Sequence, residues 1–301
     1  MESGSWRPIS LMVQIFKLFE KVLLNHAKFN SKNNHYNRQK GFRSKMGCDH
    51  ALSNVTEIVE KALINRGYCL AISLDARGAF NELSFEAIFS IMKRNGIDEG
   101  LIAINGDFLK NRQMTFSDMT FRGVSLTHYC ASRVPQRGVW ASQLFSFCID
   151  GLYESIDRIQ TPISVHMTSS GYADDVIILS SSKNLKQAYR YAQFAINACE
   201  RWGMENSLAF SSSKSFGLLF TRKQDYLNKI NQFPAVLNGD QIKMVPTIKH
   251  LGLNFDRNLF FTDHFRIITA RAKSAICRTA NLMVVVQKLN YCGIKRLYGL
   301  L

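Results

Sequence analysis

Three aspartates stand where a carboxylate is costly unless it is paired or binds a cation. Asp75 ends the apolar run 69–74, which the sequence predicts to be a buried strand. Asp174 and Asp175 are adjacent in the segment 171–175 (Gly-Tyr-Ala-Asp-Asp), between two further predicted strands. Neighbouring carboxylates repel each other, and a hard divalent cation relieves that cost because it accepts carboxylate, water and phosphate oxygens.

These aspartates could perform phosphoryl transfer if they lie together. If the strand that ends at Asp75 lies beside the hairpin that carries Asp174 and Asp175, the carboxylates converge at its tip. That arrangement suits two-metal chemistry, in which one ion activates a 3′-hydroxyl and the other holds the leaving pyrophosphate. The alternative is that Asp174-Asp175 is only a polar turn, since Asp is common in turns.

The elements that must position these aspartates follow from hydrophobic spacing. Helical spacing predicts one helix that begins after Pro8. It predicts further helices over 52–63, 85–92, 144–156, 185–199 and 263–289. Short apolar runs predict strands at 69–74, 207–210, 216–220 and 248–255, a hairpin over 164–182 and another around Asn238-Gly239. Segment 114–133 is mixed and predicts strands and loops. This order favours an α+β sheet with helices on one face.

Composition and charge point to a folded protein with a polyanionic partner. The chain has 301 residues, 46% of them hydrophobic, and 38 Lys and Arg against 23 Asp and Glu give a net charge of +15. The length predicts two or three sub-domains around a large core. The charge favours nucleic acid first and an anionic membrane surface second, and a solvated basic surface is the alternative.

Cysteine usage and the N-terminal residues bear on the compartment. The seven cysteines form no CxxC pair, so the sequence predicts neither a disulfide framework nor a zinc knuckle. A reducing compartment, nucleus and cytoplasm, is the expectation. Residues 1–7 show no basic-then-apolar signal pattern, and no stretch approaches the roughly 20 apolar residues of a membrane span. We therefore expect neither secretion nor membrane insertion.

Ordered sequence blocks carry a family resemblance. They read Arg-Pro-Ile-Ser-Leu at 7–11, Lys-Leu-Phe-Glu-Lys at 17–21, Gly-Phe-Arg at 41–43 followed by Ala51-Leu52, Leu-Asp-Ala-Arg-Gly-Ala-Phe-Asn at 74–81, Val-Pro-Gln at 134–136, Tyr-Ala-Asp-Asp at 172–175, Lys214, and His-Leu-Gly at 250–252. Together they resemble the reverse transcriptase domain of non-LTR (LINE-type, jockey-like) retrotransposons. The resemblance runs in order over almost the whole chain.

The resemblance implies a right-hand polymerase. Its ferredoxin-like palm would be an antiparallel sheet backed by helices, with helical fingers and a partial helical thumb. The implied division is fingers at 1–68, the first catalytic strand of the palm at 69–83, a fingers–palm connection at 84–130, palm with the Tyr-Ala-Asp-Asp hairpin and primer grip at 131–255, and partial thumb at 256–301.

The resemblance also assigns catalytic and primer-binding roles. Asp75, Asp174 and Asp175 would be the triad that binds two Mg²⁺ (or Mn²⁺) ions. Lys214 would protonate the leaving pyrophosphate, and the alternative is an exposed turn lysine. His250, Leu251 and Gly252 would form the primer grip.

Four residues are implied at the dNTP site. Phe80 would exclude a 2′-hydroxyl, unless it is a core phenylalanine beside Ala79. Gln136 would touch the incoming nucleotide, unless it is an ordinary polar loop residue. Arg7 would face the triphosphate, with Lys17 as a further candidate, because guanidinium suits phosphate geometry; a solvated arginine is the alternative. Ala76 follows the first aspartate and completes the set.

The implied activity is RNA-directed DNA polymerisation, with RNA template, DNA primer and dNTPs as partners. The chain departs from the family pattern at several points. Arg137 replaces a glycine that lets the backbone approach the nucleotide in the family. Ser142 replaces a proline, and Asn81 replaces an aspartate. Gly47-Cys48 replaces Ser-Thr, and His250 replaces a tyrosine.

The family's endonuclease domain and most of its thumb have no counterpart in this sequence. We therefore expect a fragment of a longer polyprotein that supplies these regions. The alternative function is a non-catalytic, nucleic-acid-binding relic that keeps the basic surface and has lost nucleotide use through the changed loop 133–143.

Overall fold

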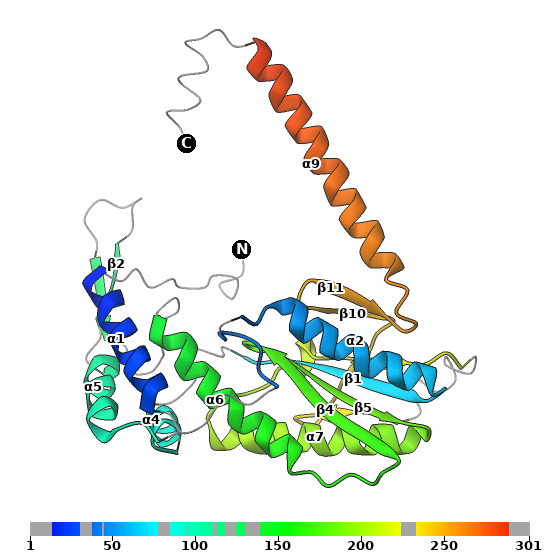
Figure 1. Ribbon diagram of the computed structural model, residues 1–301, viewed down its shortest axis with the longest axis horizontal. Coiled ribbons are helices and arrows are strands. Elements are labelled where there is room, and N and C mark those ends of the chain that lie inside the picture. Colours follow the sequence, from blue (N-terminus) through cyan, green and yellow to red (C-terminus); the bar gives the residue numbers. More distant parts are fainter. Residues whose placement is uncertain are drawn as a thin grey trace.

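The computed structural model describes residues 14–30, 38–43, 45–77, 85–94, 96–110, 113–117, 125–129, 139–223 and 233–288. Its centre is a five-stranded sheet with the order β4-β5-β1-β6-β9 (Figure 1). The strands are β1 (Tyr68–Asp75), β4 (Val165–Tyr172), β5 (Asp175–Ser182), β6 (Phe216–Phe220) and β9 (Lys243–Met244). All neighbours pair antiparallel except β6 and β9. The predicted antiparallel sheet backed by helices is confirmed.

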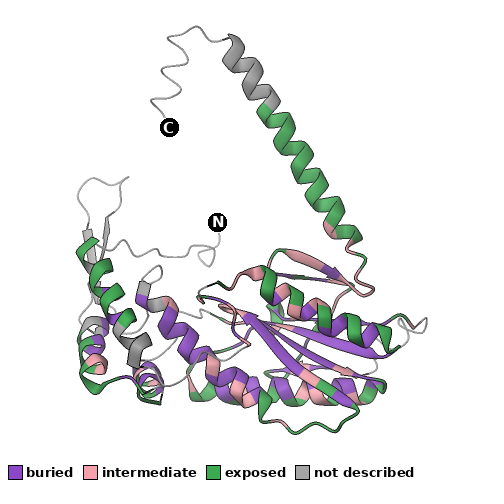
Figure 2. Cartoon of the chain, in the orientation of Figure 1, coloured by how far each residue is buried: buried purple, intermediate pink, exposed green. Residues whose placement is uncertain are grey.

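Both faces of this sheet are buried. Leu70, Ile72 and Leu74 of β1 belong to the core cluster shared with α6 (Val139–Asp157) and α7 (Leu185–Glu205). Alternate residues of the same strand, Cys69 and Ala71, pack in a second cluster with α2 (Cys48–Ile64). Figures 1 and 2 show α2 on one side of the purple strands and α6 and α7 on the other.

The prediction of helices on one face is therefore wrong. Side chains on successive strand residues point to opposite faces, so a continuous apolar run such as 69–74 needs cover on both sides. The predicted helix 52–63 supplies the second cover through Val55 and Val59, which have no exposed surface.

The predicted hairpin over 164–182 is confirmed as β4 and β5. Two predicted strands are wrong. Residues 248–255 form a hairpin, β10 (Thr247–His250) and β11 (Leu253–Asp256), because Leu251 and Gly252 have φ angles of 47° and 85° and reverse the chain. Within 207–210, Phe210 makes only an isolated bridge to Ala76.

The remaining elements lie outside the central sheet. They are α1 (Gln14–Asn30), α4 (Phe85–Arg94), α5 (Glu99–Lys110), the pair β2 (Gln113–Ser117) and β3 (Ser125–Tyr129), the 3₁₀ helix η2 (Ser212–Lys214), the pair β7 (Val236–Leu237) and β8 (Asp240–Gln241), and α9 (Thr262–Lys288). The helix α5 has no counterpart among the predictions. The Asn238-Gly239 hairpin is confirmed as β7 and β8.

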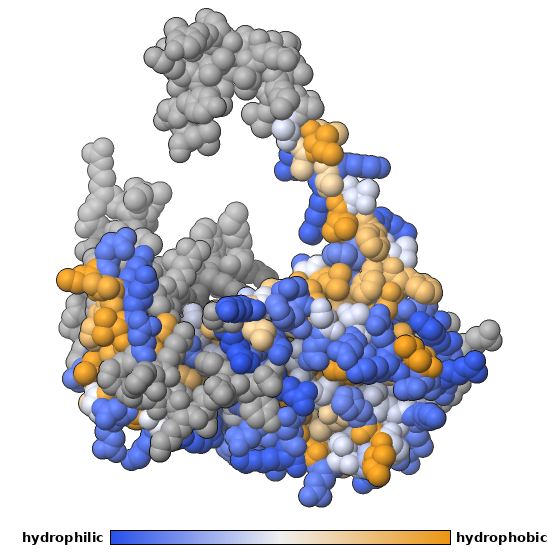
Figure 3. Space-filling model, viewed as in Figure 1, coloured by the Kyte–Doolittle hydropathy of each residue, from blue (hydrophilic) through white to orange (hydrophobic). Residues whose placement is uncertain are grey.

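The helix α9 extends away from the rest of the molecule (Figure 1). Its described side chains up to Thr279 are exposed or half-buried, and apolar ones among them, such as Phe265 and Ile276, are exposed (Figures 2 and 3). Among the described residues, no helix combines the length and the apolar character that crossing a bilayer requires.

Candidate active site

Three carboxylates lie at one end of the central sheet. Asp75 is the last residue of β1 and pairs in register with Asp175, the first residue of β5. Asp174 occupies the turn that joins β4 to β5. The flanking Leu74 and Val176 are buried in the core, whereas Asp75 and Asp174 are half-buried and Asp175 is exposed. The structure thus places the three predicted residues at the same end of the sheet, accessible to solvent.

A serine-rich segment fixes the backbone at Asp75. The Asp75 amide donates to Ser215 Oγ at 3.2 Å, and this hydroxyl donates to the Ser211 carbonyl at 2.7 Å. The Ser211 amide in turn donates to the Asp75 carbonyl at 2.8 Å. Lys214 lies in η2, one residue before Ser215, and its side chain is exposed. This predicted catalytic lysine is therefore anchored beside the end of β1.

The turn that carries Asp174 has a partner that the sequence did not reveal. The side-chain amide of Gln39 is buried and bonds both the amide and the carbonyl of Ala173. The only available signal was its position, two residues before the Gly-Phe-Arg block at 41–43.

Tyr172 faces the beginning of α2. Burial raises the pKa of Tyr172, and the neighbouring Cys48 thiol adds to that rise by its charge and by a hydrogen bond. Cys48 is the first residue of α2. The block in which Gly47-Cys48 replaces the family's Ser-Thr therefore touches the Tyr-Ala-Asp-Asp hairpin directly.

The predicted primer-grip residues form the turn region of β10 and β11. His250 is buried with 2% of its surface exposed, Leu251 is half-buried and Gly252 is exposed. Among the described residues, His250 Nε2 has no hydrogen-bond partner. Burial lowers the pKa of His250 to about 4, so this imidazole is neutral near pH 7.

The predicted dNTP-site residues are only partly described. Ala76 is half-buried and continues β1 through its bridge to Phe210. Lys17 is exposed on α1. Arg7, Phe80 and Gln136 lie outside the described residues, as do Asn81 and Arg137.

The donor set at the sheet end fits a hard divalent cation. It consists of carboxylate oxygens that are accessible to solvent, and oxygen is the ligand that Mg²⁺ and Mn²⁺ prefer. In the described ranges, no three His, Cys, Asp or Glu side chains are already gathered closely enough to hold a metal ion. The three aspartates therefore offer the oxygen ligands that such an ion prefers, and their role as its ligands stays a prediction.

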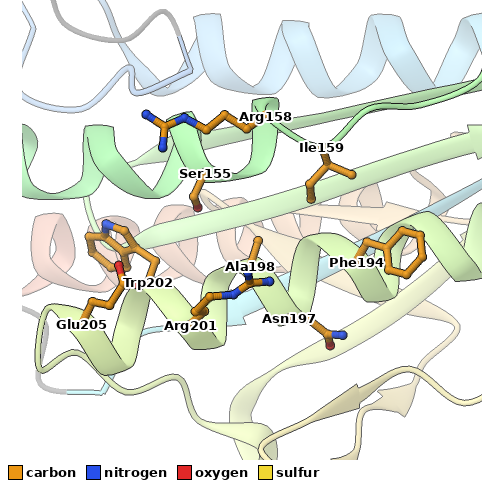
Figure 4. Close-up of a pocket in the computed structure, with 9 residues that line it drawn as sticks. All are labelled: Ser155, Arg158, Ile159, Phe194, Asn197, Ala198, Arg201, Trp202 and Glu205. Carbon is orange, nitrogen blue, oxygen red and sulfur yellow. The ribbon is translucent and has the colours of Figure 1, made fainter.

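A separate hollow of about 500 Å³ is lined by residues of α6, of α7 and of the segment that follows α6 (Figure 4). Arg158, Arg201 and Trp202 are among its lining residues, and none of the three predicted carboxylates is. Arg158 is already paired with Glu154, at 2.8 Å between Nη2 and Oε1. The hollow is therefore not part of the candidate active site.

Comparison with known proteins agrees with this geometry. Residues 2–255 match the family described as reverse transcriptase (RNA-dependent DNA polymerase). The chain is 26% identical over 302 residues to the RNA-directed DNA polymerase from mobile element jockey of Drosophila melanogaster, a match that covers 95% of this chain and 30% of the relative. It is 25% identical over 301 residues to the probable RNA-directed DNA polymerase from transposon X-element of the same species, covering 99% and 32%.

The chain therefore spans about 30% of the length of the curated relatives that it matches. Among solved structures, it resembles apo telomerase from Candida tropicalis truncated from its C-terminal domain, with a TM-score of 0.51 and 11% identity. That match covers 81% of this chain and 44% of the telomerase chain. At this identity the likeness supports the fold alone.

Proposed function

Because the chain belongs to the reverse transcriptase family, we propose that it is the polymerase portion of a non-LTR retrotransposon protein. It copies an RNA template by adding dNTPs to the 3′-hydroxyl of a DNA primer. The observation that carries this proposal is the pairing of Asp75 with Asp175 at the sheet end, with Asp174 in the adjoining turn. The division into fingers, palm and partial thumb belongs to the same proposal.

In this proposal the three aspartates hold two divalent cations, Mg²⁺ or Mn²⁺. The bound ions supply activation of the primer 3′-hydroxyl and neutralisation of the triphosphate charge. The protein's own contribution is position. The core residues Leu74 and Val176 hold the strands that carry Asp75 and Asp175, so the carboxylates face the substrate from a rigid base.

We further propose that Lys214 holds a proton near the leaving pyrophosphate. Its side chain is exposed, and its backbone is fixed through Ser215 to the end of β1. The net charge of +15 favours the phosphates of template and primer. Arg7, Phe80, Ala76 and Gln136 are proposed to contact the dNTP, and His250, Leu251 and Gly252 to contact the primer.

Primer extension with the 301-residue chain tests the proposal. With RNA template, DNA primer, dNTPs and Mg²⁺, we expect extension that Asp174→Asn reduces more than about a hundredfold, because this change removes a metal-binding charge. Template–primer affinity should change little, since it comes from Lys and Arg on phosphates. Asp107→Asn, which removes an exposed carboxylate on α5, is the matched control and should keep wild-type extension.

Two outcomes would overturn this reading. Extension that persists in Asp174→Asn would remove the carboxylates from the mechanism. A folded wild-type protein that binds template–primer with a steep salt dependence but never extends it would instead be the non-catalytic, nucleic-acid-binding relic.

A further inference from the structure

A short segment before α2 adds to the free edge of the central sheet. The Lys40 amide donates to the Gly171 carbonyl at 2.9 Å, and the Gly171 amide donates to the Arg38 carbonyl at 3.0 Å. These bonds make a parallel bridge between Gln39 and Gly171 on the outer side of β4. Arg38 also pairs with Asp157 at the end of α6, at 3.4 Å between Nη2 and Oδ2. The segment is therefore fixed at two places.

The bridge places the Gln39 side chain under the turn between β4 and β5. Gln39 has no exposed surface. Its Nε2 donates to the Ala173 carbonyl at 3.1 Å, and its Oε1 accepts from the Ala173 amide at 3.0 Å and from the Gly41 amide at 2.7 Å. A buried amide is costly unless it is paired. Gln39 meets this requirement mainly through one residue, Ala173.

Ala173 is the residue of that turn that most needs support. Its φ angle is 58°, in the left-handed region, which is unfavourable for a residue with a Cβ atom. Such a conformation persists only where the surroundings hold it. The next residue is Asp174, and the one after it is Asp175, opposite Asp75. The backbone angles of Ala173 therefore set the direction in which the carboxylate of Asp174 points.

Gly41 lets the segment approach this closely. A Cβ atom at residue 41 would overlap the Ala173 amide nitrogen and would lie 3.0 Å from Gln39 Oε1. No side chain larger than hydrogen fits there without a shift of the backbone. Gly41 and Gln39 thus form one cradle for the turn.

We propose that Gln39 is a positioning residue that holds the Ala173–Asp174 turn in the conformation that presents the carboxylates. This inference rests on the proposed polymerase function for its catalytic consequence. Its structural part, that the amide of Gln39 keeps the turn closed, stands without that function. Gln39 acts through Ala173 and touches neither substrate nor metal.

Amide hydrogen exchange in the folded 301-residue chain tests the structural part. Gln39→Leu keeps a side chain of similar volume but removes both hydrogen bonds to Ala173. Exchange of the Ala173 amide hydrogen should therefore become roughly tenfold faster. Gln193→Leu is the matched control. The Gln193 side chain bonds both the amide and the carbonyl of Val236 at 2.8 Å in the β7–β8 hairpin, which carries none of the three aspartates. It should speed exchange at Val236 and leave Ala173 unchanged.

Kinetics tests the catalytic part. Gln39→Leu should lower kcat for extension at least about tenfold and raise the Mg²⁺ concentration needed for half-maximal rate, with the template–primer Kd unchanged. Gln193→Leu should keep kcat within about twofold of wild type. An Ala173→Gly background should shrink the loss caused by Gln39→Leu at least threefold, because glycine adopts a positive φ without support.

The outcomes separate the two proposals. Unchanged exchange at Ala173 in Gln39→Leu overturns the inference, whether or not the wild type extends primers. Faster exchange with wild-type kcat and wild-type Mg²⁺ dependence overturns its catalytic part. If Gln39→Leu does not fold, Gln39→Glu serves instead, because it keeps the acceptor oxygen and loses only the donor. Gln39→Glu should then give intermediate exchange at Ala173, and wild-type exchange there would count against the inference.

Discussion

Two hairpins of this molecule are each held by a glutamine amide, but their turns form for different reasons. In the β7–β8 hairpin, Asn238 and Gly239 have φ angles of 52° and 84°, which this residue pair adopts readily. In the β4–β5 hairpin the turn contains no glycine, and Ala173 has a φ angle of 58°. Gln39, 134 residues earlier in the chain, supports it. The first turn is thus encoded locally, whereas the one that carries the carboxylates depends on tertiary contacts.

A side chain added at Gly171 should give the largest test of whether tertiary contacts hold the β4–β5 hairpin. A Cβ atom at residue 171 would overlap the Tyr153 hydroxyl and lie 3.1 Å from the Asp175 carbonyl. We expect Gly171→Ala to lower the free energy of unfolding by about 3 kcal/mol, the upper range for overpacking. Chemical denaturation followed by far-UV circular dichroism measures this loss.

Tyr153→Phe provides the control for that prediction. The Tyr153 hydroxyl is buried without a hydrogen-bond partner among the described residues, and burial raises the pKa of Tyr153. Its removal alone should cost little. In combination with Gly171→Ala it should recover part of the lost stability. A Gly171→Ala protein as stable as wild type would show that the hairpin yields easily and is not held by its surroundings.

The same contrast explains which features the sequence could predict. The strand before Asp75, the Asn238-Gly239 hairpin and the two strands that flank the Tyr-Ala-Asp-Asp turn all carry local signals, and each is confirmed. The second buried face of the sheet was missed, because a run such as 69–74 does not state which helix covers which side. Strand 248–255 was wrong because periodicity alone did not reveal the positive φ angles at Leu251 and Gly252.

The site shows the same limit. The aspartates at the ends of apolar runs and the family blocks pointed to the same three residues, and the structure places these residues at one end of the sheet. Gln39 carried no signal of its own, because its role arises only when the segment before α2 lies along β4. A polar residue between Arg38 and Lys40 resembles many exposed loop residues in sequence, yet it is fully buried.

The β10–β11 hairpin extends the comparison to pH. Burial lowers the pKa of His250 to about 4, below the value near 6.5 of an unfolded histidine. The unfolded chain therefore binds the extra proton more readily, and stability falls as pH drops from 6.5 towards 4. Between pH 7 and pH 5 this one group should cost about 2 kcal/mol.

Denaturation of wild type and His250→Phe at both pH values isolates that effect. Other groups contribute equally to the two proteins, including His166, whose pKa burial also lowers. The loss between pH 7 and pH 5 should therefore be about 2 kcal/mol smaller in the variant. Equal losses would mean that His250 is hydrated in the native state and that this hairpin is loosely packed.

Single substitutions at the positive-φ residues of the two turns should give the smallest changes in stability, but they compare the turns most directly. Gly239→Ala places a Cβ atom at a φ angle of 84° with no atom within 4 Å, so its only cost is backbone strain, and we expect a loss of about 1 kcal/mol. Ala173→Gly relieves the same strain at 58° and should raise stability by about 0.5 kcal/mol, since the more flexible unfolded chain offsets part of the gain. Opposite signs in paired denaturation experiments would place the strain in the turn that carries the carboxylates. A loss of stability in Ala173→Gly would instead mean that contacts of the Ala173 methyl group stabilise the fold. The turn that Gln39 holds would then carry little backbone strain.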